Sequence, residues 1–184
     1  MENIQHILTA TIQQAKNGNS EALANLYAQF SKAMFNICVR MIGNRVDAED
    51  ILQESFIIAF KNLNQLKDAV QFGGWLRRIV VNECIRYSKK QFYFNEWNDS
   101  EHEMVIAETG EDWFKQIDMS LVHKHIKSLP DGCRQVFNLY VIENFGHKEI
   151  ANSLGISEST SKSQYHRARQ LLKERLTKEI AIYG

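Results

Sequence analysis

Residues 148–169 read KEIANSLGISESTSKSQYHRAR, and this stretch decides how the C-terminal third of the chain folds. Ile150 and Leu154 have the spacing of one apolar helix face. Gly155 can adopt the left-handed conformation that ends a helix, and Ser157 is a suitable N-cap for a second helix. The sequence therefore predicts two helices joined by a short turn.

The second of these helices has one apolar and one polar side. Tyr165, Ala168 and Leu172 share the apolar side, so they should face the core. The remaining side chains, which carry hydroxyl, amide and cationic groups, are expected to point outward. Such groups suit the major groove of DNA, where they read base edges and neutralise phosphates. A helical hairpin with a solvated basic side would show the same pattern, so the rest of the chain must decide.

Composition favours an all-α protein without a membrane segment. The chain has 184 residues, 44% of them hydrophobic, with 9 glycines and a single proline, which favours long helices over a turn-rich β fold. No run of about twenty uncharged apolar residues occurs, and the N-terminus lacks the order of a signal peptide. We therefore expect a cytoplasmic protein that does not insert into membranes.

Charge is distributed unevenly although the formal net charge is zero. Residues 1–90 carry a net charge of +3, residues 91–118 of −7 and residues 119–184 of +4. The acidic stretch shows no sustained helical period. We predict two small helical domains, 1–91 and 119–184, joined by an acidic linker at 92–118.

Residue types that support catalysis or metal binding do not cluster. Cys38, Cys84 and Cys133 are odd in number, far apart and flanked by apolar residues, so we interpret them as core residues rather than as disulfides or ligands. There is no HExxH motif, no phosphate-binding glycine loop and no Cys or His cluster at ligand spacing. The sequence thus predicts a protein that is not an enzyme and needs no metal or cofactor.

Three segments, in this order, resemble the extracytoplasmic-function (ECF) sigma factors of RNA polymerase. They are DAEDILQESFIIAF at 47–60, FGGWLRRIVVNECIRYSKK at 72–90 and SLPDGCRQVFNLYVIENFGHKEIANSLGISESTSKSQYHRARQLL at 128–172. The likeness covers nearly the whole chain. It implies a first domain that binds core polymerase and the minus-ten element, and a second, helix-turn-helix domain that binds the minus-thirty-five element.

Segment 47–60 resembles the polymerase-binding helix of the family. Its carboxylates could pair with a basic partner helix, and the resemblance implies a coiled coil in the clamp of the largest polymerase subunit, with the flap of the second-largest subunit as a further contact. The alternative is that early carboxylates only favour the helix N-terminus. The polymerase-binding residues we expect are Asp47, Asp50, Gln53, Glu54 and Ile57.

Segment 72–90 and the loop before it resemble the part of the family that melts the minus-ten element. Opening a duplex requires a pocket for an unstacked base and a basic track for the displaced strand. We interpret Trp75 as a core anchor rather than a stacking platform, because it is in register with Ile79. The expected minus-ten residues are Asn64, Gln71, Trp75, Arg77, Arg78, Asn82, Arg86, Lys89 and Lys90.

In the last segment the resemblance places Lys162, Ser163, His166 and Arg167 where the family's recognition helix reaches DNA. Two positions depart from the family: Ser161 replaces a frequent valine, which could soften local packing, and Gln164 replaces a frequent arginine and could bind adenine. The expected minus-thirty-five residues are Lys148, Ser159, Thr160, Lys162, Ser163, Gln164, His166, Arg167 and Arg169.

The resemblance therefore predicts a sigma factor that directs promoter-specific initiation and binds core RNA polymerase and promoter DNA. In the family the acidic linker threads the active-site channel and the RNA exit path; a solubilising spacer explains its charge equally well. A helix-turn-helix repressor or activator that acts without polymerase is the main alternative. A helical adaptor that binds only protein would leave the basic helix without a purpose. Whether an anti-sigma factor is a further partner stays open.

Overall fold

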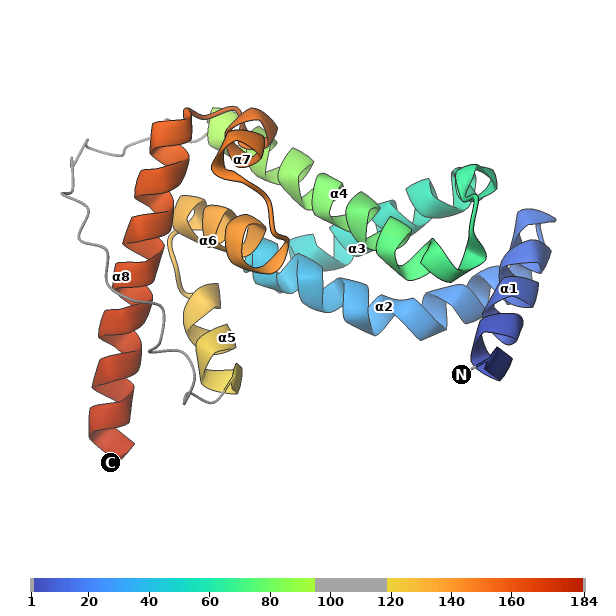
Figure 1. The fold of residues 1–184 in the computed structure, drawn as a ribbon, viewed down its shortest axis with the longest axis horizontal. Helices are drawn as coiled ribbons and strands as arrows, with labels where there is room; N and C mark the ends of the chain where they lie inside the picture. Colours follow the sequence, from blue (N-terminus) through green and yellow to red (C-terminus); the bar gives the residue numbers. More distant parts are fainter. Residues whose placement is uncertain (1, 95–118, 184) are drawn as a thin grey trace. The chain divides into compact units, whose positions relative to one another are not determined.

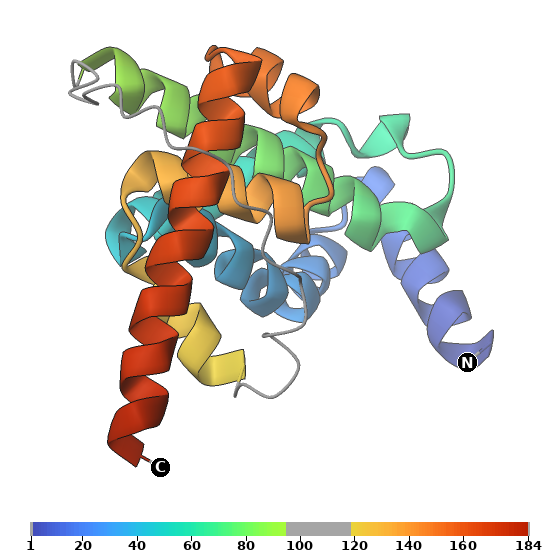
Figure 2. The same cartoon turned by 60° about the vertical axis from the view of Figure 1, so that its left-hand side comes forward.

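The computed structural model describes residues 2–94 and 119–183, and these residues form helices and turns with no strand. The predicted all-α class is thereby confirmed (Figures 1 and 2). The chain divides into two compact units. The first contains the residues up to Val39 together with Asn44–Tyr87, and the second contains Arg40–Gly43 and the residues from Ser88 onward.

The first unit begins with long helices and short connections (Figure 1). Its elements are α1 (Glu2–Lys16), α2 (Ser20–Ile42) as far as Val39, α3 (Arg45–Lys61), the 3₁₀ turns η1 (Leu63–Gln65) and η2 (Ala69–Gln71), and α4 (Phe72–Phe94) as far as Tyr87. The C-terminal ends of α2 and α4 belong to the second unit. Gly18 has φ +81°, which lets the chain reverse between α1 and α2. The side chain of Asn19 accepts a hydrogen bond from Ala22 N–H at 2.9 Å. Asn19 is therefore the N-cap of α2, and Ser20 is the first residue of the helix.

The core of the first unit is apolar and rich in aromatic rings. Leu26, Phe72 and Leu76 are fully buried, and they come from α2 and α4. Tyr27 on α2 is 39% exposed, and its ring packs against that of Phe56 with 4.7 Å between the ring centroids. Burial of these side chains supplies most of the driving force that holds the helices together.

The loop between α3 and α4 is held in place by α1 and by its own side chains. Lys16 at the end of α1 donates a hydrogen bond to the carbonyl of Leu66 at 2.8 Å. Asp68 caps η2 by accepting from Val70 N–H at 3.0 Å. The loop is therefore tied down although much of its surface is exposed.

The second unit is arranged around one long helix. Its further elements are α5 (Met119–Lys127), α6 (Asp131–Phe137), the π-helical turn η4 (Asn138–Ile142), α7 (His147–Leu154) and α8 (Glu158–Tyr183). Helices α5, α6 and α7 each pack along α8 (Figure 2). Cys133, Phe137 and Leu172 lie in the shared core and are buried. Cys38 and Cys84 are also buried, which confirms the interpretation of the cysteines as core residues.

Helices α7 and α8 form the predicted helix-turn-helix. Gly155 has φ +74°, and its N–H and that of Ile156 both donate to the carbonyl of Ala151. Ser157 caps α8, because its hydroxyl accepts from Thr160 N–H at 2.9 Å. Both local signals in the sequence act as expected.

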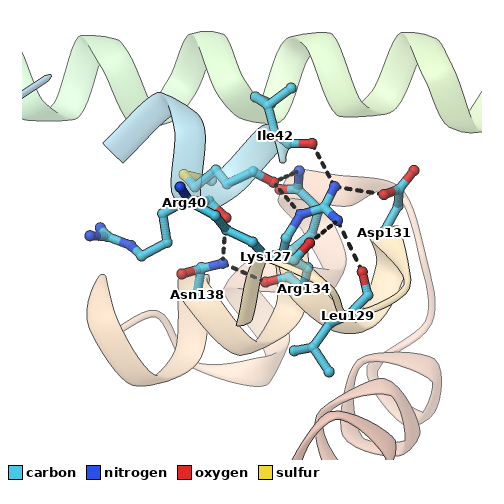
Figure 3. Close-up of polar contacts among 9 residues, drawn as sticks. Arg40, Ile42, Lys127, Leu129, Asp131, Arg134 and Asn138 are labelled. Carbon is cyan, nitrogen blue, oxygen red and sulfur yellow. Dashed lines mark hydrogen bonds and ion pairs between the residues drawn. The ribbon is translucent and has the colours of Figure 1, made fainter. Parts of the chain in front are cut away.

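A buried arginine, which the sequence did not single out, organises the polar core of the second unit (Figure 3). The guanidinium of Arg134 donates to the carbonyls of Met41 at 3.2 Å, Ile42 at 2.6 Å and Leu129 at 3.0 Å, and to the carboxylate of Asp131 at 2.6 Å. Met41 and Ile42 are the last residues of α2, where carbonyls lack partners within the helix. The cation of Arg134 therefore satisfies the end of a helix and interacts favourably with its dipole.

In the part of the chain that the structure describes, no helix combines the length and the apolar character needed to cross a lipid bilayer. Among the same residues, no group of three or more His, Cys, Asp or Glu side chains has the arrangement of a metal site.

Candidate nucleic-acid interface

Helix α3 presents most of the expected polymerase-binding residues on one face. Asp50, Gln53, Glu54 and Ile57 are exposed and follow the i, i+3, i+4, i+7 spacing of a single helix side. Ile57 is 45% exposed at the end of this acidic face. Asp47, one turn earlier, is half-buried. An apolar residue beside several carboxylates is the composition expected of a docking face for a basic helix.

The expected minus-ten residues fall into three groups by position. Asn64 and Gln71 are exposed in the loop between α3 and α4. Arg78, Asn82 and Arg86 are exposed on α4 at intervals of four residues, so they form a stripe on one side of that helix. Within this stripe the guanidinium of Arg86 forms an ion pair with Glu83.

The remaining expected minus-ten residues differ from one another in exposure and in the unit to which they belong. Arg77 is exposed, while Trp75 is half-buried with its ring 6.0 Å from that of Phe72. This packing is what an anchor for the start of α4 requires. Lys89 is half-buried and Lys90 exposed, and both belong to the second compact unit rather than the first.

The N-terminal half of α8 carries the expected duplex-reading residues. Lys162, Ser163 and Arg167 are exposed, and His166 is half-buried on the same part of the helix. The Lys162 ammonium pairs with Glu158 one turn earlier at 2.7 Å, which lowers the pKa of the Glu158 carboxyl. Phosphate would compete with this carboxylate for the lysine.

The other expected duplex-reading residues lie around this group. Ser159 is exposed and Thr160 half-buried, and both hydroxyls lie 2.7 Å from that of the cap residue Ser157. Lys148 is exposed on α7, and the Arg169 guanidinium lies 5.7 Å from the ring centroid of Tyr165. The set is thus gathered on two adjoining helices.

Gln164 does not point outward as expected. Its side chain is 6% exposed, and its Oε1 accepts a hydrogen bond from the thiol of Cys133 at 3.0 Å. Gly132 makes room for it, because a Cβ at that position would lie 3.3 Å from the same oxygen. The prediction that Gln164 points outward is therefore wrong. Because its amide is held in the core, it is not presented to a base edge, and the argument that it could bind adenine no longer applies.

Ser161 and His147 form a contact that the sequence did not reveal. Ser161 is completely buried, and its hydroxyl lies 2.9 Å from Nδ1 of His147 at the start of α7. The only signal in the sequence was the departure of Ser161 from the valine frequent in the family. The predicted acidic linker, by contrast, lies almost entirely outside the described residues.

Two family models match the chain in the order of its helical units. The model described as Sigma-70 region 2 matches residues 26–92, and the one described as Sigma-70, region 4 matches residues 120–172. The first match includes α3 and nearly all of α4, and the second includes α7 and the N-terminal part of α8. These matches define the class as sigma-70-type proteins.

Similar proteins of known identity assign the chain to one group within this class. Over 184 aligned residues the chain is 30% identical to the ECF RNA polymerase sigma factor SigW of Bacillus subtilis (strain 168), covering 94% of this chain and 98% of SigW. It is also 30% identical over 157 residues to the ECF RNA polymerase sigma factor SigE of Mycolicibacterium smegmatis, covering 83% of this chain and 61% of SigE. The chain belongs to the ECF sigma factors.

Among solved structures, the chain is similar to the sigma factor RpoE from Bartonella quintana, which was crystallised with the anti-sigma factor NepR. The sequence identity is 20% and the TM-score 0.48, and the match covers 84% of this chain and 96% of that chain.

Proposed function

We propose that this protein binds core RNA polymerase and directs initiation at promoters, reading the minus-thirty-five element as duplex with α8 and the minus-ten element as a melted strand with the α3–α4 loop and α4. The observation that carries the proposal is the exposure of the acidic face of α3 and of the cationic half of α8 in a chain with sigma regions 2 and 4 in order. Both faces are available to partners of opposite charge. The protein would act by recognition and not by catalysis.

Each part of the proposal has a physical basis. The carboxylates on α3 favour a basic helix of the polymerase, for which the clamp coiled coil is the partner that the family implies. The arginines on α4 can neutralise the phosphates of a separated strand. Since two surfaces on one chain bind the same holoenzyme–promoter complex, neither needs high affinity by itself. The flap contact and an anti-sigma partner stay predictions.

Run-off transcription with purified core RNA polymerase tests the proposal. Addition of the protein should produce transcripts from specific start sites, whereas the protein alone should shift promoter duplex only weakly. Tight, sequence-specific duplex binding without polymerase, together with no specific start sites in its presence, would instead support a repressor or activator.

Two pairs of variants assign the faces. Glu54→Lys should weaken polymerase binding, and Glu21→Lys, a charge reversal at an exposed site on α2, should not. Arg167→Ala should lower initiation at promoters that depend on the upstream element by about 5- to 150-fold, which corresponds to about 1–3 kcal/mol for a bidentate base contact. Lys178→Ala, near the exposed far end of the same helix, is its control. Equal effects of a variant and its control would reject that assignment.

A further inference from the structure

Three aromatic rings and one buried hydroxyl meet where the two helices of the helix-turn-helix cross. The rings of Tyr140 in η4 and His147 in α7 stack with centroids 4.4 Å apart and planes inclined by 13°. The ring of Tyr165 in α8 lies against both, at 4.6 Å from Tyr140 and 5.7 Å from His147. Since a stacked imidazole has little freedom to rotate, Nδ1 of His147 is directed at the hydroxyl of Ser161.

This contact adds a second attachment between α7 and α8. The first is the turn at Gly155, which joins the end of α7 to the start of α8. The second joins the first residue of α7, His147, to Ser161 in the first turns of α8. A turn alone permits rotation of one helix about it, and apolar packing tolerates small shifts, whereas a directional hydrogen bond at a distance from the turn does not.

Ser161 also lies next to the residues whose positions a restraint on the rotation of α8 would fix. It directly precedes Lys162 and Ser163 on the recognition helix, and it is fully buried while they are exposed. A rotation of α8 that moved its hydroxyl away from His147 would move those side chains by a similar amount. Base-edge hydrogen bonds depend steeply on distance and angle, so the rotation would weaken reading of sequence more than contact with phosphates.

We propose that His147 and Ser161 are positioning residues that fix the rotation of the recognition helix and thereby set its sequence specificity, without themselves touching DNA. This inference rests on the proposed function of α8 as the reader of the upstream element. It assigns a specificity role to two side chains on the inner side of the helix-turn-helix.

Burial, and to a lesser extent the charges around the pair, favour a neutral imidazole. Burial and the nearby ammonium of Lys162 lower the pKa of His147, His166 acts in the same direction, and Glu158 opposes them. Lys148 and Glu149 follow His147 on α7, and the phenols of Tyr140 and Tyr165 flank the ring. A neutral ring with its proton on Nε2 leaves Nδ1 free to accept the Ser161 hydroxyl proton.

Transcription by the full chain with core RNA polymerase, on two promoters that differ only in the upstream element, tests the inference. The readout is the ratio of initiation on the cognate promoter to that on the altered one. Ser161→Ala and His147→Phe should each lower this ratio about tenfold, as expected for one lost buried hydrogen bond. The double variant should be no worse than either single one, because the two side chains act through one bond.

Controls separate this role from general stability. Thr177→Val removes an exposed hydroxyl from α8, and His123→Phe replaces an exposed histidine on α5; neither should change the ratio. Ser161→Thr, which keeps the hydroxyl, should retain most of it. Circular dichroism will show whether Ser161→Ala is folded. If it is not, the inference is tested by His147→Phe, which keeps a stacked ring, together with Ser161→Thr.

Several results would overturn the inference. They are an unchanged ratio in the single variants, losses that add in the double variant, and equal loss of initiation on both promoters. Failure of the proposed function itself looks different: the unaltered protein would then give the same initiation on both promoters.

Discussion

Replacement of Gly43 by alanine should destabilise the second unit far more than the same change at an equivalent glycine. Gly43 has φ +82°, a conformation that costs a residue with a side chain about 1–2 kcal/mol. A Cβ at this position would lie 2.8 Å from Cζ of Arg134 and 3.0 Å from both terminal nitrogens, so the guanidinium would have to move.

The movement should be costly because the guanidinium is buried and fully engaged. Arg134 is 5% exposed and donates to the carbonyl of Ile42 at the end of α2, at 2.6 Å, and to the carbonyl of Leu129 between α5 and α6, at 3.0 Å. Displacing it would leave buried carbonyls and a buried cation with poorer partners, at a cost of about 1–3 kcal/mol. With the backbone strain added, Gly43→Ala should lower the free energy of unfolding by about 2–5 kcal/mol.

Gly155→Ala is the matched control within the same unit. Gly155 has φ +74°, and the nearest atom to an added Cβ is 4.0 Å away, so only the backbone term of about 1–2 kcal/mol should appear. Gly18→Ala repeats the control in the first unit, where φ is +81° and no atom lies within 4 Å of the added Cβ.

Urea unfolding followed by circular dichroism measures these differences, with each transition fitted separately if the two units unfold apart. An Arg134→Met background provides a second check, because Gly43→Ala should there cost only the backbone term. Equal destabilisation by Gly43→Ala and Gly155→Ala would refute the reasoning, as would an unchanged cost of Gly43→Ala in the Arg134→Met background.

Three further predictions follow from individual contacts. Asn144 has φ +59°, so Asn144→Val should lower the unfolding free energy by about 1–2 kcal/mol while Asn144→Gly should not, as thermal unfolding would show. Hydrogen bonds from Lys124 and His125 on α5 lower the pKa of Glu179 below its ordinary 4.5, so the stability that this carboxylate contributes is present above that pH and is lost as the pH falls through the lowered pKa. Glu179→Gln should therefore flatten the acid limb of the profile of stability against pH. Lys16→Met should speed amide hydrogen exchange in the loop between α3 and α4, and Lys61→Met, which alters an exposed lysine on α3, should not.

The features that the sequence predicted correctly are those set by short-range signals. Gly155 and Ser157 determine a helix end and a helix start through their own conformational and capping preferences, so the helix-turn-helix could be placed from its residues alone. The apolar face of α8 was equally readable, because Ala168 and Leu172 follow the helical period and are fully buried. The exposed face of α3 follows the same period, because Asp50, Gln53 and Glu54 lie on one side of the helix.

The features that escaped prediction depend on partners distant in sequence. Arg134 reads as an ordinary exposed cation until its acceptors on Met41 and Ile42, more than ninety residues earlier, are brought to it. Gln164 lies on a polar stretch of α8, and only the close approach allowed by Gly132 makes its side of the helix an inner one. A periodicity argument assigns a helix face from the helix alone, so it cannot locate a polar group that a neighbouring helix covers.

These buried polar groups share one property that bears on DNA recognition. Ser161 and Gln164 lie on the inner side of the same turns of α8 that expose Lys162 and Ser163. Ser161 is hydrogen-bonded to His147 of α7, and Gln164 is hydrogen-bonded to Cys133 of α6. Two directional hydrogen bonds on different sides of a helix fix its rotation about its own axis. An apolar surface of the same area would restrict that rotation less, because apolar packing tolerates small shifts. Because the outer side chains move with the inner ones, the positions that distinguish the DNA preference of this chain from that of its relatives are expected to include residues that never contact a base.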